Sequence, residues 1–119
     1  MVWSVEFTDQ FRVWWSQLST EEQTALGHKV LLLEQRGPLL GRPHADTLKG
    51  ARLPNLKELR AECRGGAYRV LFAFDPRRVA ILLWGGRKTS EDFYEAAIPE
   101  AEKLSDQHLA ELRKEGILP

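Results

Sequence analysis

The residues of this chain that could do chemistry are cations and aromatics in its middle and just beyond it. Lysine and arginine bind phosphate oxygens and aromatic rings stack on bases, so the combination is typical of a surface for single-stranded nucleic acid. The same groups could cleave RNA without a metal. A ribose 2′-hydroxyl attacks its neighbouring phosphate, arginine and lysine stabilise the developing charge, and tyrosine or lysine moves the proton. The candidates are Lys57, Arg60, Arg64, Arg69, Arg87, Lys88, Phe93 and Tyr94.

A structural role is the alternative for the arginines of this set. Arg60 and Arg69 could pair with Glu58, Glu62 or Asp75 across neighbouring strands. They would then stabilise a sheet instead of binding a substrate. This alternative explains single residues better than it explains the whole set.

The charge distribution supports a site for a polyanion, although 17 basic residues balance 17 acidic ones. Residues 36–88 hold twelve Lys and Arg against four acids, a balance of +8, whereas residues 1–35 and 89–119 have balances of −3 and −5. Local fields, not net charge, steer a polyanion to a site. Scatter of these charges over a solvated surface remains the alternative.

Several familiar kinds of catalytic site are absent from the sequence. It has no Gly-rich phosphate loop, no CxxC, no HExxH and no Gly-x-Ser-x-Gly elbow. His28, His44 and His108 lack the spacing of metal ligands, and the single Cys63 is typical of a small buried side chain. We therefore expect no metal and no cofactor.

Length and hydropathy predict one domain over residues 1–119. The apolar runs are too short to cross a bilayer, and no secretory signal pattern follows Met1. We expect a cytoplasmic protein that does not bind membranes.

Hydrophobic periodicity predicts a strand and a helical hairpin in the first third of the chain. Residues 2–7 alternate as a half-buried strand, and a helix follows over about 9–18. Ser19 and Glu22 have the spacing of a capping box for a second helix over about 20–35.

The rest of the chain predicts a loop, three strands and a terminal helix. The loop is rich in Gly and Pro, and the third of these strands is apolar enough to be buried on both faces. Pro99 is expected to restart a helical segment that opens at Thr89 or Ser90 and ends near Glu115. The predicted ranges are 37–55 for the loop, 56–63, 68–75 and 78–85 for the strands, and 64–67 and 76–77 for the turns. The order β-α-α-β-β-β-α indicates an α+β fold, with a helical hairpin packed on a small, mainly antiparallel sheet and a C-terminal helix.

Three segments resemble one known group of proteins. They are LPNLKELR at 53–60, YRVLFAFDPR at 68–77 and LLWGGRKT at 82–89, with Tyr94 following. Together they resemble the RelE/ParE superfamily of type II toxins, and most of all its HigB-like branch of phage-derived Gp49-like proteins. The resemblance covers nearly the whole chain and implies a RelE-like fold.

The resemblance implies an mRNA interferase, an endoribonuclease that binds the A site of the 70S ribosome and cleaves mRNA there. A HigA-like antitoxin with a helix-turn-helix would hold it inactive, and operator DNA would be bound only through that complex. By position, Arg69 matches the arginine that contacts the scissile phosphate, Arg60 a further cation, and Arg87 and Lys88 the basic position after the last strand. Tyr94 matches a tyrosine that stacks on a base or transfers a proton.

One departure and two other functions stay open. Glu62 stands where the RelE branch has a lysine, which places a carboxylate near the expected site. A ParE-like poison of DNA gyrase shares the fold, but such proteins tend to lack the Arg/Lys/Tyr set. A non-catalytic, prophage-derived binding protein is the other alternative.

Overall fold

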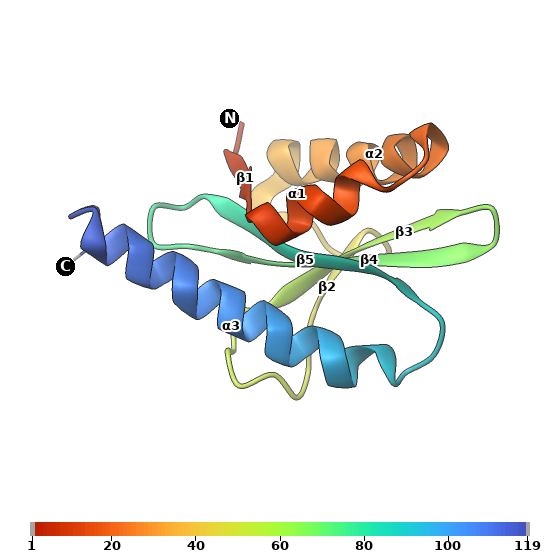
Figure 1. Ribbon diagram of the computed structural model, residues 1–119. Helices are drawn as coiled ribbons and strands as arrows, with labels where there is room; N and C mark the ends of the chain where they lie inside the picture. The colour runs from red at the N-terminus through yellow and green to blue at the C-terminus, as the bar shows by residue number, and fades with distance from the viewer. Residues whose placement is uncertain (1, 119) are drawn as a thin grey trace.

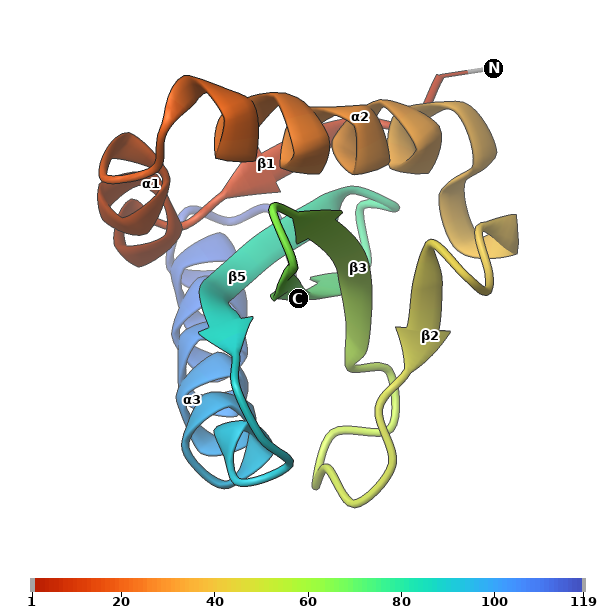
Figure 2. The same cartoon turned by 90° about the vertical axis from the view of Figure 1, so that its right-hand side faces the viewer.

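The protein is built in three layers, with one mixed sheet between two layers of helix (Figure 1). This computed structural model describes residues 2–118, so Met1 and Pro119 of the predicted domain lie outside the described residues. α1 and α2 cover one face of the sheet and α3 runs along the other (Figures 1 and 2). The elements are β1 Val5–Phe7, α1 Asp9–Ser16, α2 Thr20–Arg36, the 3-10 helix η1 Gly37–Leu39, β2 Ala45–Thr47, β3 Lys57–Cys63, β4 Gly66–Phe74, β5 Ala80–Lys88 and α3 Phe93–Lys114.

The predicted α+β class and element order are confirmed, with one strand added. The sheet order is β1-β5-β4-β3-β2, and every neighbouring pair is antiparallel except β1 with β5. The prediction that residues 37–55 form only a loop is wrong, because this segment contains η1 and the short strand β2. β2 pairs with residues 57–59 of β3 and forms an edge of the sheet.

Local capping explains where the two N-terminal helices begin. The Thr8 hydroxyl accepts a hydrogen bond from Phe11 N at 3.0 Å and donates to Leu83 O at 2.8 Å, which ties α1 to β5. The predicted capping box is confirmed, since Ser19 Oγ accepts from Glu22 N and the Glu22 carboxylate accepts from Ser19 N. Both helices therefore begin at residues that satisfy otherwise unpaired backbone donors.

Two apolar cores lie on the two faces of the sheet, as the side-chain alternation of its strands requires. Alternate residues of β4 and β5 point into each core, so β5 is buried on both faces as predicted. Trp14 and Trp15 are half-buried against the α1–α2 core. The α1–α2 core includes Phe11, Leu26, Leu33, Val70 and Phe72, and the α3 core includes Leu56, Leu71, Leu83, Ala101 and Leu104.

The last helix differs from its prediction. α3 is one continuous helix with Pro99 inside it, so the expected restart at this residue is wrong. Proline lacks the N–H that would bond the carbonyl of Glu95. Both residues are exposed, so water can solvate that carbonyl, and packing of the buried face of α3 outweighs the lost bond. α3 thus holds Tyr94 in its first turn against the sheet.

Candidate RNA-cleaving site

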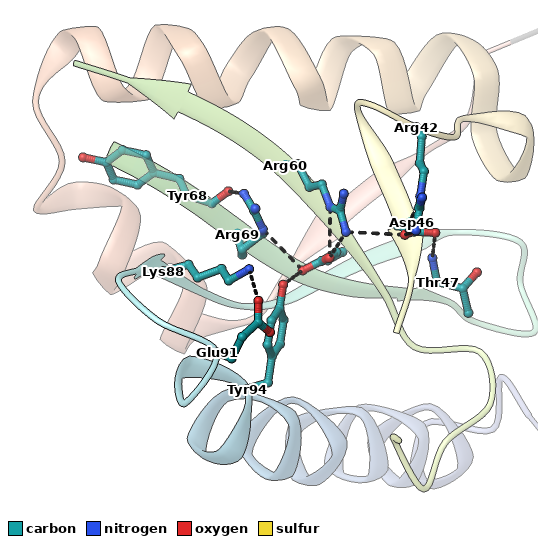
Figure 3. A network of polar contacts seen from close by, with 10 residues as sticks. Arg42, Asp46, Thr47, Arg60, Tyr68, Arg69, Lys88, Glu91 and Tyr94 are labelled. Carbon is teal, nitrogen blue, oxygen red and sulfur yellow. Dashed lines mark hydrogen bonds and ion pairs between the residues drawn. The ribbon is translucent and has the colours of Figure 1, made fainter. Parts of the chain in front are cut away.

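The candidate site is a cleft lined by β2 and the loops around it, by β3, by the end of β5 and by the start of α3. It has a volume of about 420 Å³, and Arg60, Lys88 and Tyr94 are among its lining residues. In Figure 3, Arg60 and Arg69 project from the neighbouring strands toward Tyr94 of α3. Arg60 lies directly opposite Arg69 in the antiparallel register, so the two guanidinium groups share one face of the sheet.

A buried carboxylate lies at the centre of this cluster. The side chain of Glu58 on β3 is 2% exposed, and its Oε2 accepts a hydrogen bond from Arg60 Nε at 3.1 Å. Its Oε1 accepts a hydrogen bond from the Tyr94 hydroxyl at 2.7 Å and lies 3.6 Å from Arg69 Nε. Two arginines facing each other would repel, and a buried carboxylate without partners would be costly. Glu58 therefore holds three of the predicted site residues in one arrangement.

Arg69 keeps unused hydrogen-bonding capacity. Its side chain is 12% exposed, and one guanidinium nitrogen donates to the carbonyl of Tyr68 at 3.0 Å. Its buried Nε has no hydrogen-bond partner among residues 2–118. An unsatisfied buried donor costs about 1–3 kcal/mol, and here the Glu58 carboxylate 3.6 Å away compensates the charge without a hydrogen bond.

Tyr94 acts as a donor in this arrangement. Burial and the hydrogen bond to the Glu58 carboxylate raise the pKa of Tyr94 above its ordinary value, so the hydroxyl stays protonated at neutral pH. Lys88 Nζ lies 5.2 Å from the centre of the Tyr94 ring and completes the cation set of the cleft.

Carboxylates also contact the cations at the outer rim of the cleft. Glu91 lies 2.9 Å from Lys88 Nζ, and this hydrogen bond holds the pKa of Glu91 below its ordinary value. On the opposite rim, Asp46 of β2 accepts from Arg42 and from Arg60, at 2.8 and 3.4 Å. The Arg42 contact is the main reason that the pKa of Asp46 is lowered. The lining of the cleft therefore holds four cations against three carboxylates, and Arg42, Arg60 and Lys88 each contact one of these carboxylates.

The structure brings half of the predicted site residues together. Arg60, Arg69, Lys88 and Tyr94 line or flank the cleft. Phe93 lies beside them, but its ring packs on Trp84, with ring centres 5.6 Å apart, and is half-buried in the α3 core.

The structure places Lys57, Arg64 and Arg87 outside this cleft. Lys57 points to the α1–α2 side, where its Nζ lies 5.9 Å from the centre of the Phe74 ring. Arg87 pairs in register with Tyr68 and lies on that same side, since successive residues of a strand alternate between faces. Arg64, in the β3–β4 turn, is held by two hydrogen bonds to Glu21 at the start of α2.

Sequence reasoning missed the central role of Glu58 and the support from Asp46. The structural alternative for the arginines is confirmed for Glu58, which pairs with both Arg60 and Arg69. Glu62 is exposed and makes no ion pair with described residues. The sequence did contain a signal for Glu58. Two arginines that face each other across neighbouring strands need a counter-ion between them, and Glu58 is two residues from Arg60.

The described residues contain neither a cluster of three or more His, Cys, Asp and Glu side chains that could hold a metal nor a helix long and apolar enough to span a membrane. His108 and His44 make local contacts, with Asp75 and Lys29 respectively.

Comparisons with known proteins agree with this fold. Residues 13–106 match the family described as phage-derived protein Gp49-like (DUF891). The candidate toxin HigB3 of Mycobacterium tuberculosis is 40% identical over 103 residues, which cover 85% of this chain and 89% of HigB3. The candidate toxin HigB2 of the same organism is 36% identical over 112 residues, covering 92% of this chain. This chain spans only about half of HigB2, since the match covers 55% of that protein.

Solved structures of RelE toxins share the architecture at low sequence identity. A mutant of Escherichia coli RelE in the free state superposes with a TM-score of 0.60 and 17% identity, covering 87% of this chain and 97% of RelE. A chain of the M. tuberculosis RelBE2 toxin–antitoxin complex gives a TM-score of 0.55 and 21% identity, covering 76% and 95% of the two chains. Since the family match spans most of the chain and both mycobacterial relatives share more than a third of the aligned residues, the chain belongs to the phage-derived Gp49-like family and is HigB-like, with the fold of the RelE structures.

Proposed function

We propose that this protein is the toxin of a type II toxin–antitoxin system and that it cleaves mRNA in the A site of the ribosome. The observation that carries the proposal is the cluster of Arg60, Arg69, Lys88 and Tyr94 around the buried Glu58 carboxylate. The cluster combines cations that can bind a phosphate with the Tyr94 hydroxyl and the Glu58 carboxylate, which share a hydrogen bond along which a proton can move. The names of HigB2 and HigB3 as candidate toxins support the toxin role.

The positions of these groups support the following cleavage step. The ribose 2′-oxygen attacks the adjacent phosphorus and passes its proton to the Tyr94 oxygen while the Tyr94 proton moves to Glu58, 2.7 Å away. Arg69 and Arg60 stabilise the charge that builds on the non-bridging oxygens. The P–O5′ bond breaks and the 5′-oxygen takes a proton from Lys88. The products are a 2′,3′-cyclic phosphate and a 5′-hydroxyl, and the step needs no metal or cofactor.

The proposed partners are an antitoxin, the 70S ribosome and mRNA. Solved RelBE complexes, in which a toxin of this fold is bound to its antitoxin, support an antitoxin partner. A HigA-like antitoxin with a helix-turn-helix would carry the complex to operator DNA. Action on ribosomes places the toxin in the cytoplasm, and residues 1–119 would form one domain sufficient for this activity.

The test is to express the protein in bacteria and to map new mRNA 5′ ends, with Arg69→Ala as the decisive variant. We expect wild type to stop growth and to cut mRNA at codon-defined positions. The Arg69→Ala variant should lose at least about 100-fold in cleavage rate, because preorganised charge stabilisation of this kind contributes a factor of about 10²–10³. Arg113→Ala, at an exposed position in the last turn of α3, is the matched control and should cut like wild type.

Each other outcome points to a different function. DNA breaks with an SOS response would indicate a gyrase poison, and an absence of toxicity would indicate a binding protein. Full cleavage by a folded Arg69→Ala variant would contradict the phosphate role of this residue. Arg69→Lys, which keeps the charge beside Glu58, separates loss of chemistry from loss of folding. Metal independence has its own test, in which purified protein acts on ribosomes that were pretreated to limit free divalent ions. Cleavage should persist as long as these ribosomes stay assembled.

A further inference from the structure

A second polar groove lies on the far side of Arg60, outside the cleft described above. It has a volume of about 780 Å³ and runs between α2 and the outer edge of β3. Arg60 lines both the groove and the cleft, so the two hollows adjoin at this side chain. The other polar residues that line the groove are Thr24, His28, Lys29, Glu62 and Arg69.

The groove exists because β2 stops short. β2 pairs with β3 only as far as Leu59, and the Arg60 N–H bonds to His44 O at 2.8 Å just beyond it. In the described chain, residues 61–63 have no strand on their outer side. This leaves space between the last part of β3 and α2, which packs over it. An extended chain could lie there without any rearrangement of the sheet.

The walls of the groove are positively charged. Lys29 Nζ lies 2.7 Å from His44 Nδ1, and no carboxylate of residues 2–118 lies within ion-pairing distance of this lysine. Burial lowers the pKa of His44, and the charges of Lys29, Arg36 and His28 lower it further. A neutral His44 accepts a hydrogen bond from Lys29 and leaves the lysine charge uncompensated.

Two arginines at the floor add to the charge of Lys29. Arg60 and Arg69 line the groove, although Glu58 already compensates part of their charge from the cleft side. The single carboxylate of the lining is Glu62, which is exposed. The groove therefore favours an anionic chain, and the side chain of Glu62 opposes it at one place.

We propose that this groove binds the RNA backbone next to the scissile phosphate, with Lys29 contacting a flanking phosphate and Arg60 lying between the two subsites. This inference rests on the proposed RNA-cleaving function and names the path of its substrate. Single-stranded RNA fits because its charge is strung along a flexible backbone that can pass from one hollow to the next.

The test compares Lys29→Met with Lys29→Arg in binding to RNA that cannot be cleaved. The probe is a fluorescent single-stranded RNA of about ten nucleotides with 2′-O-methyl riboses, and anisotropy is measured at several salt concentrations. We expect Lys29→Met to weaken binding about 3- to 10-fold at low salt and to reduce the slope of log K against log salt by about 0.7, the value for one phosphate contact on a single strand. Lys29→Arg should keep both the affinity and the slope.

Two further variants sharpen the result. Lys103→Met removes an exposed lysine of α3 outside the groove and should bind like wild type. Glu62→Gln should tighten binding, because it removes the opposing carboxylate. A folded Lys29→Met variant with wild-type affinity and slope would overturn the inference, and so would a wild-type protein that binds no RNA.

This experiment is independent of the cleavage assay. If ribosomal mRNA is not cut but RNA binding depends on Lys29, the proposed catalytic function fails and the groove stands. If mRNA is cut and the Lys29 variants bind alike, the function stands and the groove is not the RNA path.

Discussion

At the scale of single residues, Glu91 should control how easily a phosphate reaches Lys88. Its carboxylate lies 2.9 Å from Lys88 Nζ at the rim of the cleft, and its side chain is 83% exposed. A substrate phosphate has to replace this contact. We therefore expect Glu91→Gln to tighten binding of the 2′-O-methyl RNA by about two- to five-fold, since exposed ion pairs are individually weak.

A double-mutant cycle checks that the effect passes through Lys88. In a Lys88→Met background, Glu91→Gln should leave RNA affinity unchanged, because the cation that it releases is gone. Glu95 is an exposed carboxylate in the first turn of α3, and Glu95→Gln serves as the control for the general loss of negative charge. Equal tightening by both single variants would show that Glu91 has no special position.

The residue scale is also where sequence reasoning reached its limit. The period-two alternation of a strand is enough to place Arg60 with Arg69 and to separate Arg87 from Lys88, so this part of the site was predictable in principle. Glu58 was not recognisable as buried. Alternation puts it on the polar side of β3, and only the packing of α3 over that side makes it the centre of the cluster.

At the scale of elements, two glycines should respond in opposite directions to the same substitution. A Cβ on Gly85 of β5 would overlap the ring of Trp14, which packs there from α1. A Cβ on Gly27 of α2 would meet no heavy atom within 4 Å. Gly85→Ala should lower the free energy of unfolding by about 1–3 kcal/mol through overpacking. Gly27→Ala should raise it by about 0.5–1 kcal/mol, because alanine favours helix.

Urea unfolding of both variants at neutral pH gives the comparison. The midpoints should move to opposite sides of the wild-type midpoint, with similar slopes. A Gly85→Ala variant as stable as wild type would mean that Trp14 repacks freely, and that the contact between α1 and β5 is not a tight one.

Elements with a strong local pattern were predictable, and those set by distant contacts were not. The capping box at Ser19 and Glu22 and the alternation of β3 and β4 are local signals, and the structure confirms the elements that they predict. β2 has three residues and exists because it pairs with β3. α3 continues through Pro99 because its buried side packs on the sheet, which no signal near this residue indicates.

At the scale of the whole molecule, folding redistributes the charge that the sequence concentrates in its middle. Seven of the twelve basic residues of 36–88 form ion pairs, and several of their partners come from the acidic ends of the chain. Glu6, Glu21 and Asp106 are such partners, and none of them lines the cleft. The basic surface is therefore smaller than the balance of +8 suggests, and it is concentrated at the cleft and the groove beside it.

One of these networks joins two strands of the sheet to α3. Asp75, at the end of β4, has a side chain that is 2% exposed and lies 2.6 Å from an Arg77 nitrogen and 2.9 Å from His108 Nε2 on α3. Arg77 also reaches Glu6 of β1, at 2.9 Å. Burial alone would raise the pKa of Asp75, but the hydrogen bonds from Arg77 and His108 outweigh it and hold the pKa below its ordinary value. The network thus stabilises the fold only while Asp75 is ionised.

Asp75→Asn should therefore lower stability at neutral pH and lower it less in acid. A carboxyl with a depressed pKa contributes its full stabilisation above the pKa of the unfolded chain, about 3.9, and loses it as the pH falls toward the lower pKa of the folded protein. We expect a loss of about 1–3 kcal/mol at pH 7, because Arg77 and His108 lose a charged acceptor, and a clearly smaller loss near pH 3. Urea unfolding at both pH values measures this loss of stability.

The control is Asp106→Asn, which breaks the exposed pair with Arg52 and should change stability by less than about 0.5 kcal/mol at either pH. A difference between wild type and Asp75→Asn that stayed constant from pH 7 to pH 3 would show that the network stabilises by shape and not by charge.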